Sequence, residues 1–281
     1  MPVRPYLEIT RFTLCAIVFA MALEGYWLAI RRFEPFQPEA LLAALTVACA
    51  IGFANAFNDI VDEPVDRVNA PRRPIPSGRI GLAQGKWLVA LLCLLSLALG
   101  ALAGPRMLLL TLGALAGSAL YNLWARRVPL LGNAIVALLC ALTLSAGYCV
   151  ARDGVFPIVP FASSFTFILA RELLGTAGDV AGDRVGGRVT LAMLLGARPV
   201  LGLCLGLALL ALLLLASAVW YVAYPAFYLA CLLLTSLLPI GLAARALWRD
   251  HSPERIRAVS YRMRVVFAAN IVTFLFLVPR G

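Results

Sequence analysis

Long apolar runs alternate with short polar segments along the whole chain. Nine runs are about 20 residues long, which is the length that an α-helix needs to cross the hydrocarbon core of a bilayer. Backbone polar groups in lipid must be satisfied within the segment, so these runs predict helices rather than strands. The predicted spans cover residues 12–30, 40–58, 87–104, 107–125, 130–151, 155–175, 199–221, 223–247 and 264–279. The pattern therefore predicts an all-α polytopic membrane protein.

The composition excludes an ordinary soluble domain. Of the 281 residues, 62% are hydrophobic and 14% are charged, with a mean hydropathy of +0.92, whereas soluble domains are near 45–50% apolar and 25% charged. The first run follows a basic N-terminus, but it begins late and contains Glu24. We therefore expect a retained helix rather than a cleaved signal peptide. The seven cysteines lie in apolar runs without a Cys-x-x-Cys pair, which is typical of packing residues.

The basic residues predict the orientation. If the nine spans alternate, 19 of the 24 Lys and Arg residues lie on the side that also carries the N-terminus and the long polar loops. The positive-inside rule places that side in the cytoplasm, and an odd number of spans places the C-terminus opposite. This predicts an integral protein of the cytoplasmic membrane. It also accounts for most of the net charge of +10 without a nucleic-acid partner.

Half of the acidic residues fall in two short segments of the predicted cytoplasmic side. In the first segment, the helical spacing of Asn58, Asp59, Asp62 and Asp66 places all four on one face. In the second segment, Asp179 and Asp183 are four residues apart and Glu172 precedes them.

Such carboxylates repel one another on one face and need a counter-charge at a membrane boundary. Mg²⁺ prefers oxygen ligands and typically takes one or two carboxylates together with phosphates and water. Arginines, whose planar forks match phosphate oxygens, interleave with both segments: Arg67, Arg72, Arg73, Arg79, Arg184 and Arg188. Two facing acidic segments therefore predict a metal–diphosphate site. The alternative is a pair of solvated loops with ordinary Asp–Arg pairs.

With these motifs the sequence resembles the UbiA superfamily of intramembrane prenyltransferases over essentially its whole length. The family motif N-D-x-x-D-x-x-x-D is complete at residues 58–66, and residues 69–78 resemble the N-x-P-x-R-P-I-P-S-G continuation of one branch. That branch includes the archaeal-type digeranylgeranylglyceryl phosphate synthases and the chlorophyll synthases. The second motif, D-x-x-x-D followed by Gly and Thr, matches Asp179, Asp183, Gly187 and Thr190, and residues 121–133 resemble a third family segment.

The resemblance implies a single domain over residues 1–281, with about nine helices around a central cavity that opens at the cytoplasmic face. It also implies two Mg²⁺ ions, one held by the first motif, with Asn58, Asp59, Asp62 and Asp66 as its metal-binding residues, and the second held by Asp179 and Asp183. Arg73 would bind a prenyl diphosphate, and Tyr121 would lie near the site. The implied reaction is ionisation of an allylic diphosphate and capture of the carbocation by a lipophilic acceptor, with release of diphosphate.

Further residues are candidates for parts of this reaction. We expect Arg67, Arg126 and Arg188 to contact the diphosphate, and Asn133 to be either a substrate-binding residue or a helix hydrogen-bond donor. The π-face of Tyr121 would stabilise the cation, unless this ring is only an interfacial anchor. Tyr148 is a candidate for the same part or a packing residue. For Glu24 the alternatives are a site residue, a partner of an intramembrane donor, or a residue at the end of the span. For Glu172 they are a structural partner of Arg171 or a site residue.

Some positions depart from the family pattern. Arg126 stands where the family has lysine, and Gly175, Thr176 and Ala181 stand where the archaeal-type branch has Lys, Asp and Glu. These changes weaken the expectation of a glycerol-phosphate acceptor, so the acceptor and the oligomeric state stay open.

A terpene cyclase that ionises the same kind of diphosphate is the nearest alternative. A transporter of anionic lipids or metabolites is disfavoured because the polar groups gather at one membrane face. Gly-x-x-x-Gly pairs at residues 100/104, 113/117 and 202/206 predict close helix packing.

Overall fold

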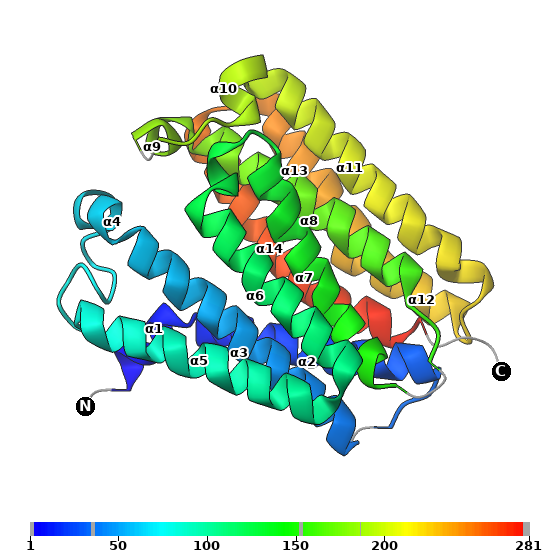
Figure 1. Cartoon of the computed structure of the whole chain (residues 1–281). Coiled ribbons are helices and arrows are strands. Elements are labelled where there is room, and N and C mark those ends of the chain that lie inside the picture. The colour runs from blue at the N-terminus through cyan, green and yellow to red at the C-terminus, as the bar shows by residue number, and fades with distance from the viewer. Residues whose placement is uncertain (1–2, 35–36, 152–153, 186, 278–281) are drawn as a thin grey trace. The chain divides into compact units, whose positions relative to one another are not determined.

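The computed structural model describes residues 3–34, 37–151, 154–185 and 187–277, and the regular elements in these ranges are helices (Figure 1). The chain forms two compact units. One contains residues 1–125 and 143–154, and the other contains residues 126–142 and 155–281. Helix α7, Leu131–Val150, contributes its first part to the second unit and its last part to the first.

The first unit is built around α3. This helix packs against α2, α5 and α6, and Figure 1 shows α5 running along it. Pro38 begins α3 and Pro105 begins α6. Proline lacks a backbone N–H, and it is tolerated here because the N–H groups of the first helical turn have no acceptor within the helix. The helices are α1 (Arg4–Ile9), α2 (Phe12–Ile30), α3 (Pro38–Val61), α4 (Glu63–Asn69), α5 (Leu82–Ala103) and α6 (Pro105–Leu123).

Two glycines bring α2 and the last part of α7 into backbone contact. A Cβ atom on Gly25 would lie 1.9 Å from the carbonyl oxygen of Leu144, and one on Gly147 would lie 2.1 Å from the amide nitrogen of Tyr26. By contrast, at Gly104, Gly113, Gly202 and Gly206 no described atom lies within 4 Å of such a Cβ. The Gly-x-x-x-Gly prediction is therefore wrong for these four, because a glycine pair permits close packing only where a second helix approaches it.

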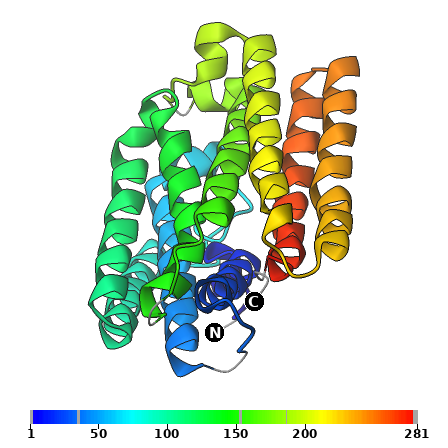
Figure 2. The same ribbon diagram turned by 90° about the vertical axis from the view of Figure 1, so that its right-hand side faces the viewer.

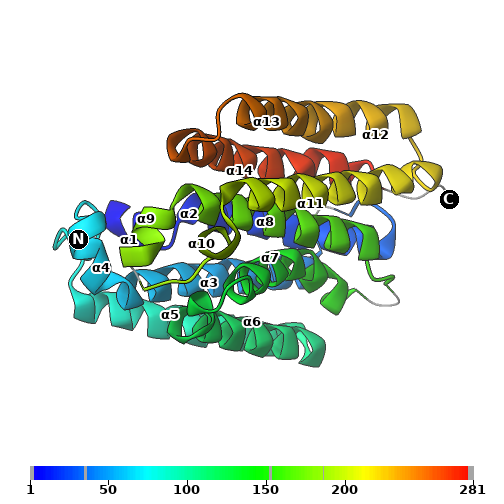
Figure 3. The same ribbon diagram turned by 90° about the horizontal axis from the view of Figure 1, so that it is seen from above.

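The second unit is built around α8. This helix packs against α11 and α14, and α13 packs against α14. Figures 2 and 3 show α13 and α14 running side by side. The elements are η1 (Ala125–Arg127), which begins one residue before this unit, α8 (Ile158–Gly178), α9 (Val180–Val185), α10 (Leu191–Leu195), α11 (Ala197–Ser217), η2 (Ala218–Trp220), α12 (Pro225–Leu232), the π-helix η3 (Leu233–Leu237), α13 (Leu238–Arg249) and α14 (Pro253–Leu275).

Eight helices of the described chain are long and apolar enough to cross a membrane. Their outer faces carry large exposed apolar side chains such as Leu94, Leu102 and Leu109, as expected of surfaces that contact lipid. The ranges are Phe12–Ile30, Pro38–Val61, Leu82–Ala103, Pro105–Leu123, Leu131–Val150, Ile158–Gly178, Ala197–Trp220 and Pro225–Arg249. These agree with the first eight predicted spans.

The ninth predicted span, residues 264–279, is not among the eight. The structure merges most of it with the preceding polar segment into the single helix α14, and residues 278–279 lie outside the described chain. Four arginines, at positions 255, 257, 262 and 264, lie in the first half of α14. The polar first half makes α14 less hydrophobic as a whole than the other long helices, although its last turns are apolar, so a ninth span stays a prediction.

Candidate active site

The first acidic motif lies at the junction of α3 and α4. Pro64 at the start of α4 cannot donate to the carbonyl of Ile60, and its ring crowds that group, so α3 ends at Val61. The helical hydrogen bonds nevertheless continue across the junction, from Asp62 N–H to the Asn58 carbonyl at 2.9 Å and from Asp66 N–H to the Asp62 carbonyl at 2.8 Å. Asn58, Asp62 and Asp66 therefore keep the four-residue spacing that the sequence predicts.

Two arginines converge on the carboxylates of this motif. Asp59 and Asp66 are each 6% exposed. Arg11 Nη2 lies 3.1 Å from Asp59 Oδ1, while Arg73 Nη1 lies 2.5 Å from Asp66 Oδ2 and 3.5 Å from Asp59 Oδ1. Arg11 also donates to the Asn55 side chain, which in turn donates to the carbonyl of Thr10 at 3.0 Å. The buried carboxylates are thus balanced by charge and oriented by hydrogen bonds.

Asn58 is oriented from a different helix. Its Nδ2 donates to Oδ1 of Asn122 at 2.7 Å, and the Nδ2 of Asn122 donates to the carbonyl of Ser118 at 2.9 Å. Asn122 is 2% exposed, and its two hydrogen bonds fix the orientation of its amide. The NH₂ group of Asn58 is therefore held toward Asn122, and the side-chain oxygen of Asn58 is the atom left to face a ligand. An amide oxygen is a suitable donor for a hard cation.

The loop that carries Arg73 is anchored by its isoleucines. Ile75 and Ile80 are buried against Ile9 and Ala56. The backbone of Arg73 donates to the Ala70 carbonyl at 2.9 Å and accepts from Ser77 N–H at 3.0 Å. Gly78 has φ +74°, which disfavours any other residue at this turn. The R-P-I-P-S-G segment is therefore a folded scaffold that holds the Arg73 guanidinium at the acidic motif.

Beside this motif lies a cavity of about 490 Å³ that we call the arginine pocket. It is lined by Glu8, Arg11, Asp59, Ala70, Pro71, Arg72, Arg73, Pro74 and Arg79. Arg79 is held by Glu8 at 2.6 Å and by the carbonyl of Arg72 at 2.6 Å. Four guanidinium groups face two carboxylates here, so the lining has an excess of positive charge that favours an anionic ligand.

The second acidic motif lies in the other unit, where α8 ends and α9 begins. Asp183 N–H donates to the Asp179 carbonyl at 2.9 Å, so the two residues keep the predicted spacing of one helical turn. Their environments differ. The Asp179 side chain is 57% exposed and lies 3.9 Å from Arg257, whereas Asp183 is buried with Arg188 at 3.4 Å. The carboxylate of Asp179 also lies over Gly182, where a Cβ atom would meet it at 2.7 Å.

Burial raises the pKa of two carboxyl groups beyond the ends of the spanning helices. Desolvation raises the pKa of Asp183 to about 6, although the charge of Arg188 lowers it and that of Asp179 raises it further. The pKa of Asp66 is also raised, mainly by burial, with Arg73 acting in the opposite direction. Such shifts are common at functional sites because a bound cation restores the charged form.

The donor atoms suit a hard divalent cation. Oδ2 of Asp183 and Oγ1 of Thr190 are buried without a hydrogen-bond partner among the described residues. Within the described chain, no three His, Cys, Asp or Glu side chains are arranged to hold a metal ion by themselves. An Mg²⁺ ion usually retains water and takes further oxygens from phosphate, so protein donors supply only part of its coordination.

The remaining predicted residues occupy varied positions. Arg67 is 71% exposed and pairs with Glu63, and Arg72 and Arg184 are exposed. Tyr121 in α6 and Tyr148 in α7 are half-buried in the first unit, and Arg126 in η1 and Asn133 in α7 are half-buried in the second. Their roles stay predictions. Glu24 is 1% exposed with both carboxyl oxygens unpartnered among the described residues, whereas Glu172 pairs with Arg171 as the sequence suggested.

Sequence reasoning missed three residues that organise the two motifs. These are Arg11, Asn122 and Arg257. Arg11 and Asn122 lie 48 and 64 residues from the side chains they contact, and Arg257 lies 79 residues from the Gly178 carbonyl to which it donates. The only local signal was the position of Arg11 and Asn122 near the ends of apolar runs.

Comparison with known proteins agrees with this architecture. The sequence profile of the UbiA prenyltransferase family matches residues 16–271. A digeranylgeranylglyceryl phosphate synthase of Methanoculleus marisnigri is 34% identical over 200 residues, which cover 70% of this chain and 71% of that protein. One from Methanosphaera stadtmanae is 26% identical over 96% of this chain and 97% of its own length.

Solved structures share the fold. A structure of digeranylgeranylglyceryl phosphate synthase in membranes superposes with a TM-score of 0.78 at 24% identity, covering 98% of both chains. A UbiA homologue from Archaeoglobus fulgidus, solved with GPP and Mg²⁺, superposes with a TM-score of 0.75 at 17% identity, covering 98% of this chain and 99% of its own.

The helical fold with two carboxylate–arginine motifs defines a polytopic membrane enzyme. The chain belongs to the UbiA prenyltransferase family, so its activity is the transfer of a prenyl group within a membrane.

Proposed function

We propose that this enzyme transfers a prenyl group from an allylic prenyl diphosphate to a lipophilic acceptor and requires Mg²⁺. The observation that carries the proposal is the contact of Arg73 with Asp59 and Asp66 at the wall of the arginine pocket. This arrangement offers carboxylates for metal ions next to guanidinium groups for phosphate oxygens. The Archaeoglobus fulgidus homologues bound to GPP or DMAPP and Mg²⁺ support the same donor class.

Asn58, Asp62 and Asp66 would hold one Mg²⁺ ion, with Asp59 beside them, and Asp179 and Asp183 would hold another. Bound Mg²⁺ supplies neutralisation of the charge that develops on the departing diphosphate. Asn122 limits the rotation of Asn58, and Arg73 holds Asp66 in place. These contacts preorganise the ligands before substrate binds, so little reorganisation is needed during the reaction.

The arginines have a second part in the reaction. A guanidinium carries five N–H donors in a planar fork, and Arg73 uses one nitrogen for the two carboxylates. Its remaining donors are available for diphosphate oxygens, and we propose that Arg67, Arg126 and Arg188 also contact the diphosphate. Separation of the diphosphate from the prenyl carbon leaves an allylic cation, which the face of Tyr121 would stabilise. Asn133 would help to orient the substrate.

For the acceptor we infer a prenylated glyceryl phosphate. The support is the name shared by the curated relatives, digeranylgeranylglyceryl phosphate synthase, together with the excess of positive charge in the arginine pocket. Gly175, Thr176 and Ala181, which replace charged residues of the related branch, argue against it. The acceptor is therefore the component that the experiment must vary.

The distribution of arginines supports a cytoplasmic location of the N-terminus and of both motifs, in the cytoplasmic membrane. We propose that the whole chain works as one domain, since the family profile extends across both compact units.

The test uses membranes containing the full chain, Mg²⁺, prenyl diphosphates of several chain lengths, and either geranylgeranylglyceryl phosphate or total lipid extract as acceptor. We expect an acceptor–prenyl conjugate and equimolar diphosphate. Asp62→Asn and Asp183→Asn should lose both products, whereas Asp250→Asn, which changes an exposed acid between α13 and α14, should retain them. Unchanged release in Asp62→Asn and Asp183→Asn would refute the metal assignment. A hydrocarbon product without conjugate would establish the cyclase alternative.

A further inference from the structure

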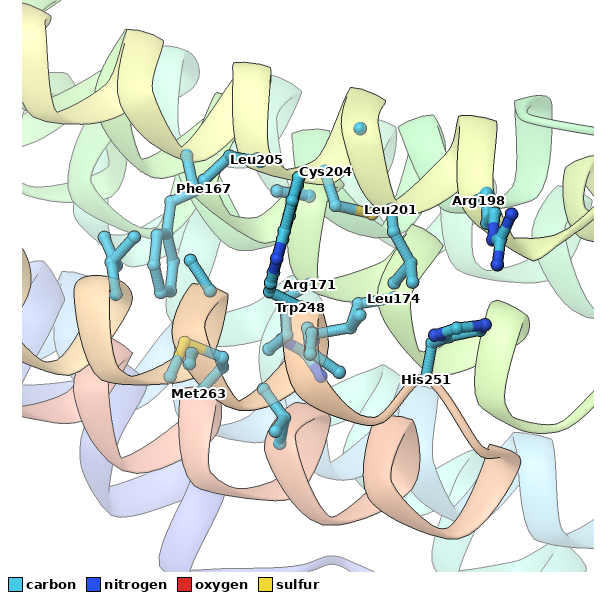
Figure 4. A pocket seen from close by; sticks show the side chains of 18 residues that line it. Phe167, Arg171, Leu174, Arg198, Leu201, Cys204, Leu205, Trp248, His251 and Met263 are labelled. Atoms are coloured by element: carbon cyan, nitrogen blue, oxygen red, sulfur yellow. The ribbon is translucent and has the colours of Figure 1, made fainter.

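The second compact unit contains a cleft that none of the proposed chemistry uses. It lies between α11 and α13, with α8 and α14 forming its floor, and it encloses about 490 Å³ (Figure 4). Helix α11 packs mainly on α8 and α13 packs mainly on α14, so the two outer helices leave space between them. A volume of this size is typical of pockets that hold a small molecule.

Most of the cleft is apolar. Phe167 and Met263 line one end, and Leu201, Leu205 and Ile240 line its walls. Gly202 widens the cleft on the α11 side, because no described atom lies within 4 Å of the position its Cβ would take. Such a surface excludes water-soluble ligands and suits a hydrocarbon chain.

The other end of the cleft is polar and positively charged. Arg198 at the start of α11 and His251 after α13 point toward one another there (Figure 4). No carboxylate of the described residues pairs with Arg198, whereas Arg171, deeper in the cleft, pairs with Glu172. Trp248 of α13, which is 90% exposed, also lines the cleft.

We propose that this cleft binds an anionic membrane lipid, with one chain along the apolar walls and the phosphate at Arg198 and His251. Three observations select this occupant. The apolar part runs between two membrane-spanning helices, so lipid chains reach it from the side. The charge of Arg198, which pairs with no described carboxylate, lies at the end of a span, where lipid phosphates are found, and basic pockets between spanning helices bind anionic head groups. Tryptophan is enriched at the same depth of a membrane.

This site is separate from the proposed catalytic residues. None of the carboxylates of the two acidic motifs lines the cleft. The inference therefore does not depend on the identity of the prenyl donor or acceptor.

The experiment measures contact between Trp248 and lipid chains. The full chain is reconstituted in vesicles that contain either brominated phosphatidylglycerol in ordinary phosphatidylcholine or the reverse, since bromine quenches tryptophan fluorescence on contact. The Trp248 signal is the difference between wild type and Trp248→Phe. We expect half-maximal quenching at an about fivefold lower mole fraction of the anionic lipid than of phosphatidylcholine, as one arginine near a phosphate contributes roughly that factor.

Two variants test the two halves of the site, and each has a matched control. Arg198→Gln should remove the preference for the anionic lipid, whereas Arg249→Gln, an exposed arginine outside the cleft, should keep it. Gly202→Leu should fill the cleft and abolish the selective quenching, whereas Gly206→Leu, one turn along the same helix and outside the cleft, should not. Equal quenching by both lipids, or selectivity that survives both Arg198→Gln and Gly202→Leu, would overturn the proposal. So would absence of quenching together with a dimer in solution, because a second copy would then cover the cleft.

Discussion

Arg73 donates from Nη1 to Oδ2 of Asp66 at 2.5 Å, and the same nitrogen lies 3.5 Å from Oδ1 of Asp59. One guanidinium therefore holds two buried carboxylates that lie seven residues apart, and it does so from the loop that follows them. A lysine has the charge but only one nitrogen, so the group that contacts both carboxylates would be the same group that must contact the phosphate, whereas the arginine fork has further nitrogens for it.

We expect Arg73→Lys to lower kcat/KM for the prenyl diphosphate by about 100-fold, the order found when one preorganised donor is removed from a charged transition state. Steady-state kinetics with saturating Mg²⁺ provide the measurement. Arg255→Lys is the control, since Arg255 pairs with Asp250 at 46% exposure on both sides. Equal kinetics for Arg73→Lys and wild type would show that the fork is not needed.

Asn122 is predicted to act through Asn58. Removing its side chain in Asn122→Ala frees the Asn58 amide to rotate, which should raise the Mg²⁺ concentration for half-maximal activity about 10-fold, as is usual when the partner of a metal ligand is lost. The KM for prenyl diphosphate at saturating Mg²⁺ should change much less. Thr111→Ala on the same helix removes a hydrogen bond that stays within α6 and should leave the Mg²⁺ dependence unaltered.

The buried carboxyl of Asp183 predicts a pH dependence. Because its pKa is raised to about 6, protons compete with Mg²⁺ below that pH, and the Mg²⁺ requirement should increase as the pH falls through about 6. Between pH 3.8, the ordinary pKa of this group, and about pH 6, the Asp183 carboxyl is protonated in the folded metal-free protein but ionised in the unfolded chain. This group therefore contributes stability below about pH 4 that is lost as the pH rises through 6. Activity titrations with Mg²⁺ test the first effect, and thermal melts in EDTA test the second. Arg188→Gln should move the midpoint of both pH dependences to higher pH, because the charge of Arg188 lowers the pKa of Asp183.

The contact of α2 with α7 predicts a large effect of one methyl group. Gly147→Ala would place a Cβ atom 2.1 Å from the Tyr26 amide nitrogen, and separation of the backbones should cost about 3 kcal/mol or prevent folding. A melt in detergent should show a clearly lower Tm than wild type. Gly113→Ala on α6 has open space for its methyl group and should melt at or slightly above the wild-type temperature. A normal melt for Gly147→Ala would refute this packing.

A substitution of Glu24 tests whether this buried carboxyl serves the fold or the reaction. Its carboxyl oxygens are buried without partners in the described chain, and a polar group in that state normally destabilises a folded protein. Glu24→Met should therefore raise the Tm in detergent. Full activity would then assign Glu24 no part in the reaction, whereas a more stable but inactive protein would place it in the machinery of transfer.

Properties set by local pattern could be predicted from the sequence. The eight spans, the four-residue spacing of Asp62 with Asp66 and of Asp179 with Asp183, and the pairing of Arg171 with Glu172 all follow from hydropathy and helical periodicity, which involve neighbours within one or two turns. The ninth predicted span stays a prediction, because its apolar residues share one helix with four arginines.

The tertiary structure alone decided which distant groups surround those motifs. Arg11 reaches Asp59 from the turn before α2, Asn122 orients Asn58 from α6, and burial distinguishes Asp183 from the exposed Asp179. The close approach of Gly147 to Tyr26 was likewise decided by the tertiary structure. The physical reason is that burial and long-range hydrogen bonds depend on which helices pack together, whereas hydropathy and periodicity depend only on the order of residues along one segment.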